Sequence, residues 1–117
     1  MMLSVSCLFT VLNLNAAEGV EFFEGKWKVL VEGTPSGDAE MIIALAKNSD
    51  GDLEGTIGME GKPDAKINRV EVKDESITLY WVSSGYDVYL FMEKVDDMEI
   101  EGTLMDMFDA YGERMKK

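Results

Sequence analysis

Residues Ser76–Lys94, SITLYWVSSGYDVYLFMEK, carry the clearest structural pattern in the chain. Apolar residues alternate with others on both sides of Ser84-Gly85, a dipeptide typical of a two-residue hairpin loop. Pairing the flanking residues across this loop brings six apolar side chains to one face, in the pairs Trp81–Val88, Leu79–Leu90 and Ile77–Met92. The opposite face then carries an aromatic patch of Tyr80, Tyr89 and Phe91. The segment therefore predicts an antiparallel hairpin with one buried face.

A second hairpin is predicted around the turn at Asp50-Gly51. Its inward pairs are Met41–Met59, Ile43–Ile57, Leu45–Gly55 and Lys47–Leu53. A weak internal repeat supports both registers, because DGDLEGTI at 50–57 aligns with DMEIEGTL at 97–104, a lag of 47 residues. With this lag, Ile43 aligns with Leu90. The register of the second hairpin places Ile43 inside, and the register of the first independently places Leu90 inside. Since a slip of one residue would reverse every side chain, this agreement predicts one shared interior.

Turn residues divide the chain into short segments of period two, and no stretch of eleven residues keeps a helical apolar stripe. We expect strands near 24–32, 38–47, 52–59, 66–73, 76–83, 86–94, 98–106 and 109–116. Gly55 and Gly102 fall at inward positions, where glycine lets a strand bend or lets another group approach. Bending is required to close a sheet. The sequence therefore predicts an all-β fold, a small antiparallel up-and-down (meander) barrel of about eight short strands.

Residues 1–17, MMLSVSCLFTVLNLNAA, carry no charge and end in small residues before the acidic Glu18. This pattern is typical of a secretory signal, and the apolar run is too short for a membrane-spanning helix. We therefore expect a signal peptide at 1–17, which removes Cys7, and one barrel domain at 18–117. The domain would be exported to the periplasm, the cell surface or the medium, with no membrane insertion after signal removal. The alternative is that 1–17 form an apolar N-terminal strand.

The charge balance excludes several classes of function. Lys and Arg total 11 against 23 Asp and Glu, a net charge of −12, and there is no histidine. The absence of histidine excludes Ser-His-Asp and Cys-His catalysis and any imidazole metal site. The negative charge repels phosphate backbones, so we expect no nucleic-acid partner. We also expect no catalytic residue, no metal and no cofactor.

The acidic loops at 48–54 and 96–101 offer oxygen ligands for calcium, but their spacing is not that of an EF-hand, and turn formation explains them as well. The methionines past residue 17 could ligate Cu(I), although adaptable core packing is the simpler role. A carboxylate-based hydrolase is the least favoured function. Its one candidate is Asp106, which we expect opposite Val88, inside an apolar face near a barrel end; the alternative is a strand-end residue in water.

Four short motifs in fixed order suggest a family. They are Gly25-x-Trp27, Thr34-Pro35-Ser36-Gly37, the pair Leu53-x-Gly55-Thr56 and Ile100-x-Gly102-Thr103, and a closing Arg114-x-Lys116. In this series the chain resembles lipocalins and the wider calycin group, and more narrowly the small lipocalin-like domains of exported bacterial proteins. The resemblance implies that Arg114 packs across the face of Trp27 beside Gly25, a cation–π contact that closes the barrel where first and last strands meet.

Two functional hypotheses remain open besides the hydrolase. The first is binding of a small apolar or amphiphilic ligand in the barrel, whose lining would include Met41, Ile43, Met59, Leu79, Trp81, Leu90 and Met92. Its alternative is that these side chains simply fill the interior. The second hypothesis is an interaction module that uses the outer face of Tyr80, Tyr89 and Phe91 for a protein partner, a second copy or a glycan. Its alternative is that the chain's own ends cover that face.

Overall fold

The computed structural model describes residues 19–115 and places them in a short helix at 19–23 followed by nine strands. The strands are β1 (Gly25–Thr34), β2 (Gly37–Lys47), β3 (Leu53–Met59), β4 (Ala65–Lys66), β5 (Arg69–Lys73), β6 (Ser76–Ser83), β7 (Tyr86–Lys94), β8 (Glu99–Leu104) and β9 (Phe108–Arg114). The all-β antiparallel fold is therefore confirmed. The expected signal peptide at 1–17, with Cys7, lies outside the described residues.

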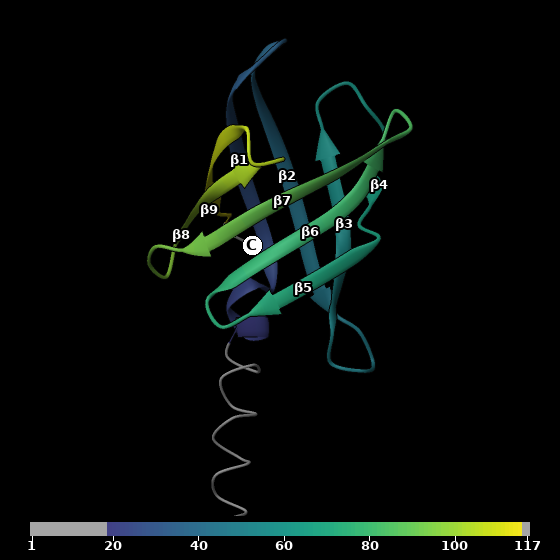
Figure 1. The fold of residues 1–117 in the computed structure, drawn as a ribbon. Helices are drawn as coiled ribbons and strands as arrows, with labels where there is room; N and C mark the ends of the chain where they lie inside the picture. Colours follow the sequence, from purple (N-terminus) through teal and green to yellow (C-terminus); the bar gives the residue numbers. More distant parts are fainter. Residues whose placement is uncertain (1–18, 116–117) are drawn as a thin grey trace, which may run out of the picture.

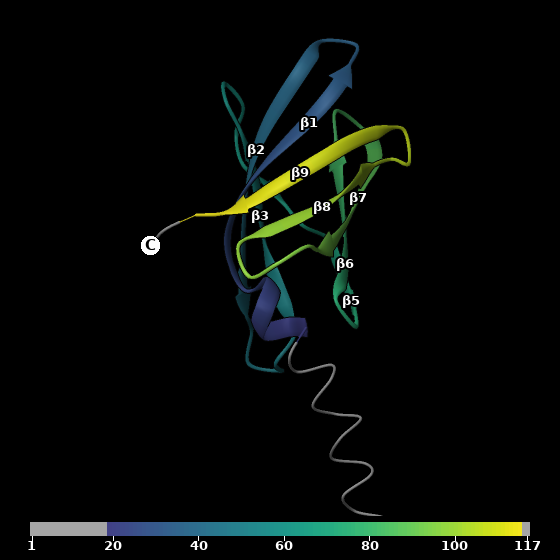
Figure 2. The same cartoon turned by 90° about the vertical axis from the view of Figure 1, so that its left-hand side faces the viewer.

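All nine strands belong to one antiparallel sheet in the order β4-β3-β2-β1-β9-β8-β7-β6-β5. Every neighbour along the chain is a neighbour in the sheet except β4 and β5, and the first strand pairs with the last. The sheet curls on itself, so that β5, β6 and β7 cross over β1, β2 and β3 (Figure 1). In the second view, β8 and β9 bridge these two halves, and the short helix lies at the lower end (Figure 2).

Continuous pairing stops between β4 and β5, where one strand was expected at 66–73. The backbone switches partners there: the Ile67 N–H donates to the Gly55 carbonyl of β3 at 2.9 Å, and the next N–H, of Asn68, donates to the Tyr80 carbonyl of β6 at 2.7 Å. Ile67 thus extends the pairing of β4 with β3, and Asn68 begins the pairing of β5 with β6. The expected barrel is a half-barrel whose two edges are linked by this crossing segment.

The predicted registers of both central hairpins are confirmed. Strand β6 pairs with β7 through Leu79↔Leu90 and Tyr80↔Tyr89, and β2 pairs with β3 through Ile43↔Ile57. Ile43 and Leu90 are 2% and 0% exposed and belong to the same core cluster. The buried core also contains residues outside the expected inward set, namely Phe23, Val31, Ile67 and Ala110.

Gly55 and Gly102, the equivalent glycines of the internal repeat, are needed for close approach. A Cβ at Gly55 would lie 1.8 Å from the Ala44 carbonyl oxygen, and one at Gly102 would lie 1.8 Å from the Phe91 carbonyl oxygen. Each oxygen belongs to the backbone of the adjacent strand, which cannot move aside cheaply. The two glycines therefore let neighbouring strands cross closely where the sheet bends.

The short helix is anchored to the sheet by Trp27 and Arg114. The Trp27 Nε1–H donates to the Phe23 carbonyl at 3.0 Å, and Phe23 is fully buried. Trp27 and Arg114 are Cα partners across β1 and β9, and the guanidinium carbon lies 4.3 Å from the centroid of the Trp27 ring. The guanidinium also donates to the carbonyls of Phe22 at 2.8 Å and Glu24 at 3.2 Å. The expected packing of Arg114 on Trp27 beside Gly25 is thus present, and the helix closes that end.

Candidate functional site

The interior expected to hold a ligand is occupied by its own side chains. Six of the seven expected lining residues are at most 4% exposed and lie in one core cluster: Met41, Ile43, Leu79, Trp81, Leu90 and Met92. Met59 is half-buried at the margin of that cluster. Four surface hollows, of about 300, 660, 520 and 330 Å³, have none of Met41, Ile43, Leu79, Leu90 or Met92 in their lining, whereas Met59 lines the third and Trp81 lines the fourth. We therefore place the candidate site on the surface of the sheet rather than in its interior.

The expected aromatic face is assembled on β6 and β7. Tyr80 and Tyr89 are cross-strand partners whose ring centroids lie 6.4 Å apart with 36° between the planes. The guanidinium carbon of Arg69, from β5, lies 4.3 Å from the Tyr80 ring centroid. Phe91 lies in the next row, between its partners Thr78 and Thr103. The three aromatic residues thus share one face, and the two tyrosines form its closest pair.

Both tyrosine rings are held by a hydroxyl-to-carboxylate hydrogen bond. The Tyr80 hydroxyl donates to Glu71 Oε1 at 2.5 Å, and the Tyr89 hydroxyl donates to Asp106 Oδ2 at 2.6 Å. The first bond, with the nearby Arg69 charge, lowers the pKa of the Glu71 carboxyl. The second bond, above all, raises the pKa of the Tyr89 hydroxyl, because Asp106 favours its protonated form. The ring planes are therefore positioned before any ligand arrives.

The turn between β8 and β9 is hydrogen-bonded to Tyr89 through Met105 and Asp106. Met105 and Asp106 both have left-handed backbones, with φ of 55° and 58°, although neither is glycine. The Tyr89 N–H donates to Met105 Sδ at 3.3 Å, and the Met105 N–H donates to the Tyr89 carbonyl at 3.0 Å. Left-handed residues are common in hairpin turns, and Asp74 and Ser84 adopt the same conformation in the β5–β6 and β6–β7 turns. The β8–β9 turn differs from these in that both of its left-handed residues bond to the same tyrosine.

The expectation for Asp106 was wrong. It does not lie inside an apolar face opposite Val88: it is exposed, and its carboxylate accepts the Tyr89 hydroxyl on the outer face. The reason is that β8 ends at Leu104, so Asp106 belongs to the turn, where alternation of side chains no longer applies.

A hollow of about 330 Å³ opens beside the tyrosine pair; we call it the aromatic hollow. Its lining is Asn68, Arg69, Tyr80, Trp81, Asp87, Val88 and Tyr89. The side chains of Asn68 and Asp87 make no hydrogen bond or ion pair with any other residue in the described part of the chain. The hollow thus combines two fixed aromatic rings with an amide and a carboxylate that are free to bind a ligand.

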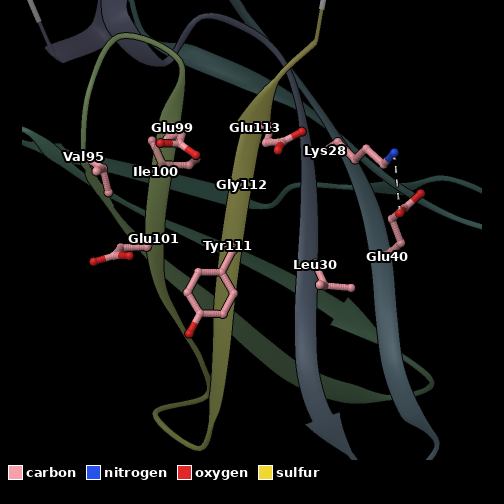
Figure 3. Close-up of a pocket in the computed structure, with 10 residues that line it drawn as sticks. All are labelled: Lys28, Leu30, Glu40, Val95, Glu99, Ile100, Glu101, Tyr111, Gly112 and Glu113. Carbon is pink, nitrogen blue, oxygen red and sulfur yellow. Dashed lines mark ion pairs between the residues drawn. The ribbon is translucent and has the colours of Figure 1, made fainter.

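A second hollow, of about 300 Å³, lies on the outer face of β1, β2, β8 and β9 (Figure 3). Glu99 and Glu113 face each other directly across β8 and β9, and no Lys or Arg between residues 19 and 115 lies within ion-pair distance of either. The charge of Asp96, with contributions from nearby glutamates, raises the pKa of Glu99. The one ion pair drawn there joins Lys28 Nζ and Glu40 Oε2 at 3.8 Å. This hollow is therefore strongly acidic.

The described residues contain no cluster of three or more His, Cys, Asp or Glu side chains arranged to hold a metal ion. Over the same residues, no helix has the length and apolar character needed to cross a bilayer. Comparison with known proteins finds no matching family model, no matching curated protein and no matching solved structure. The site must therefore be interpreted from its own chemistry.

Proposed function

We propose that the chain is an exported, non-enzymatic binding module whose binding site is the aromatic hollow on the outer face of β5, β6 and β7. The proposal includes the lipocalin-like assignment, which is supported by the stacking of Arg114 on Trp27. Export is supported by the uncharged, small-residue-terminated segment at 1–17.

One observation carries the choice of site: Tyr80 and Tyr89 lie side by side and are each fixed by a carboxylate. Holding a side chain in its bound position before binding reduces the entropy lost on association. Aromatic residues are also those that most often dominate binding energy. In the interior, by contrast, most of the expected lining residues already contact one another within the core, and only Trp81 among the buried ones also lines the aromatic hollow.

An NMR experiment tests the choice between the outer hollow and the interior. The protein, labelled at backbone amides and methionine methyls, is titrated in turn with a neutral hexasaccharide, an amphipathic peptide and laurate. We expect at least one of the first two probes to shift the amides of Tyr80, Tyr89 and Asp87. The methyls of Met41 and Met92 serve as the matched interior probes, and we expect them to remain unchanged. Shifts of both methyls with laurate, without change at the hollow, would replace this proposal with binding in the barrel interior.

A further inference from the structure

We infer that the ligand of the aromatic hollow is a neutral glycan, bound with a pyranose ring against Tyr80 and Tyr89. This inference rests on the proposed function and goes further by naming the chemical class. Four properties of the hollow support it: the ring platform, the mixed polar rim, the charge, and the hydroxyl-bearing surface beside it.

The ring platform suits the flat face of a sugar. An aromatic ring presents negative electron density on its face, and the C–H groups of a pyranose carry a small positive charge. Tyr80 and Tyr89 have ring centroids 6.4 Å apart and planes 36° apart, and the Arg69 guanidinium lies over one face of Tyr80, so a sugar ring would pack against the ring surfaces that this row leaves open. Hydrogen bonds from the two hydroxyls to Glu71 and Asp106 favour these ring positions.

The rim offers both hydrogen-bond donors and acceptors, as sugar hydroxyls require. The Asn68 amide supplies one of each kind, and the Asp87 carboxylate accepts only. Each hydroxyl of a sugar can donate one hydrogen bond and accept two, so a carboxylate and an amide together can engage neighbouring hydroxyls. A purely apolar ligand would leave both groups dehydrated without partners, which is unfavourable.

The charge of the site favours a neutral glycan over an anionic one. Arg69 is the cation in the hollow, and its Nη2 lies 3.1 Å from Glu71 Oε1, so its charge is already compensated. Asp87 adds a negative charge at the rim, and the whole chain carries −12. A phosphate, sulfate or uronate group would therefore be repelled.

The surface next to the hollow could bind further sugar units. Phe91 lies in the adjacent row of the same face, and its cross-strand partners are Thr78 and Thr103. In this row the ring of Phe91 on β7 therefore has a threonine hydroxyl on each neighbouring strand, Thr78 on β6 and Thr103 on β8. A glycan chain of several units would thus contact the tyrosine pair and Phe91 together.

The test measures binding to an array of neutral oligosaccharides and then determines affinities of the hits by calorimetry, with an oligogalacturonate as the anionic comparison. We expect Tyr80→Ala and Tyr89→Ala each to weaken binding of a hit by at least about tenfold, because each removes a stacking ring. Tyr86→Ala is the matched control: this tyrosine is 74% exposed and does not line the hollow, so binding should change by less than about twofold.

A second variant, Asp87→Ala, distinguishes loss of glycan binding from loss of folding. Asp87 is exposed and its side chain makes no hydrogen bond or ion pair with the described residues, so Asp87→Ala should keep the circular dichroism spectrum and thermal midpoint of the wild type. We expect it to weaken glycan binding by about threefold to tenfold, the loss of one solvent-exposed hydrogen bond.

The outcomes separate this inference from the function on which it rests. If no neutral oligosaccharide binds but an amphipathic peptide shifts the amides of Tyr80 and Tyr89, the glycan inference is overturned and the proposed site stands. Equal loss of affinity in Tyr86→Ala and Tyr80→Ala also overturns it, as does tighter binding of oligogalacturonate than of neutral chains. If no probe affects the hollow and laurate shifts the interior methyls, both the inference and the proposed function fail.

Discussion

Replacing Arg114 with alanine should remove one of the two side chains that anchor the short helix to the sheet, the other being Trp27. The guanidinium donates two part-buried hydrogen bonds, to the carbonyls of Phe22 and Glu24, and stacks on Trp27. A hydrogen bond of this kind contributes about 1 kcal/mol net, and a partly desolvated cation–π contact contributes about 1 kcal/mol. A third bond, to the Asp97 carbonyl, is exposed and adds little. We therefore expect Arg114→Ala to lower the free energy of unfolding by about 3 kcal/mol.

Urea denaturation, followed by tryptophan fluorescence and far-ultraviolet circular dichroism, measures this loss. Arg114→Lys should lose about half as much, because one ammonium keeps the charge over the indole but cannot span both carbonyls. Arg69→Ala is the matched control, since Arg69 also lies 4.3 Å from an aromatic centroid but on the exposed face, and it should leave stability nearly unchanged. A loss below about 1 kcal/mol for Arg114→Ala, or an equal loss for both arginines, would refute the reasoning.

Three further predictions concern single residues. Gly102→Ala should lower stability by about 3 kcal/mol or more, measured by urea denaturation, because the new Cβ would meet the Phe91 carbonyl oxygen at 1.8 Å. Tyr80→Phe should raise the pKa of Glu71 back toward its ordinary 4.5, measured by carboxyl NMR titration, because the hydroxyl that stabilises the carboxylate is gone. Glu99→Gln should raise the thermal midpoint near neutral pH at low salt, because it removes a charge placed among other carboxylates.

The two electrostatic predictions have opposite pH dependence. The pKa of Glu71 is lowered in the folded state, so its stabilising effect is complete above 4.5 and is lost as the pH falls through the lowered value. The pKa of Glu99 is raised, so its destabilising effect is present above the raised value and disappears as the pH falls to 4.5. A stabilisation by Glu99→Gln that persists unchanged well below that pH would contradict the repulsion argument. An unaltered Glu71 pKa in Tyr80→Phe would contradict the hydrogen-bond argument.

The hairpins could be predicted to the residue because a period of two leaves no freedom of register once one face is apolar. The break at the crossing segment was missed, although the sequence carried a signal for it. Ile67 and Val70 both point inward to different degrees but lie three residues apart, whereas a regular strand places inward residues at even spacing. The pair of polar residues between them, Asn68 and Arg69, marks the change of partner.

The closure at the helix could not be predicted from alternation. Residues 19–23 make little more than one turn, too short for a helical period to appear, so the buried Phe23 was not expected. Only the family resemblance indicated the stacking of Arg114 on Trp27. The stacking geometry is present, and its link to the carbonyls of the helix is an addition that the sequence did not suggest.

The aromatic pair of the candidate site was predictable, but its polar partners were not. Tyr80 and Tyr89 follow from one hairpin register, which is local information. Asn68 and Arg69 reach the same place through the crossing segment and β5, and Asp106 reaches Tyr89 from a turn. These contacts depend on how strands distant in sequence are brought together, which a period-two pattern does not specify.

The most direct test of the central claim is the detection of intermolecular nuclear Overhauser effects between the protein and a bound neutral oligosaccharide. We expect contacts from the ring protons of Tyr80 and Tyr89 to the C–H protons of one sugar unit, and no contact to the methyls of Met41 or Met92. Contacts to those two interior methyls, with none to the tyrosine rings, would contradict it.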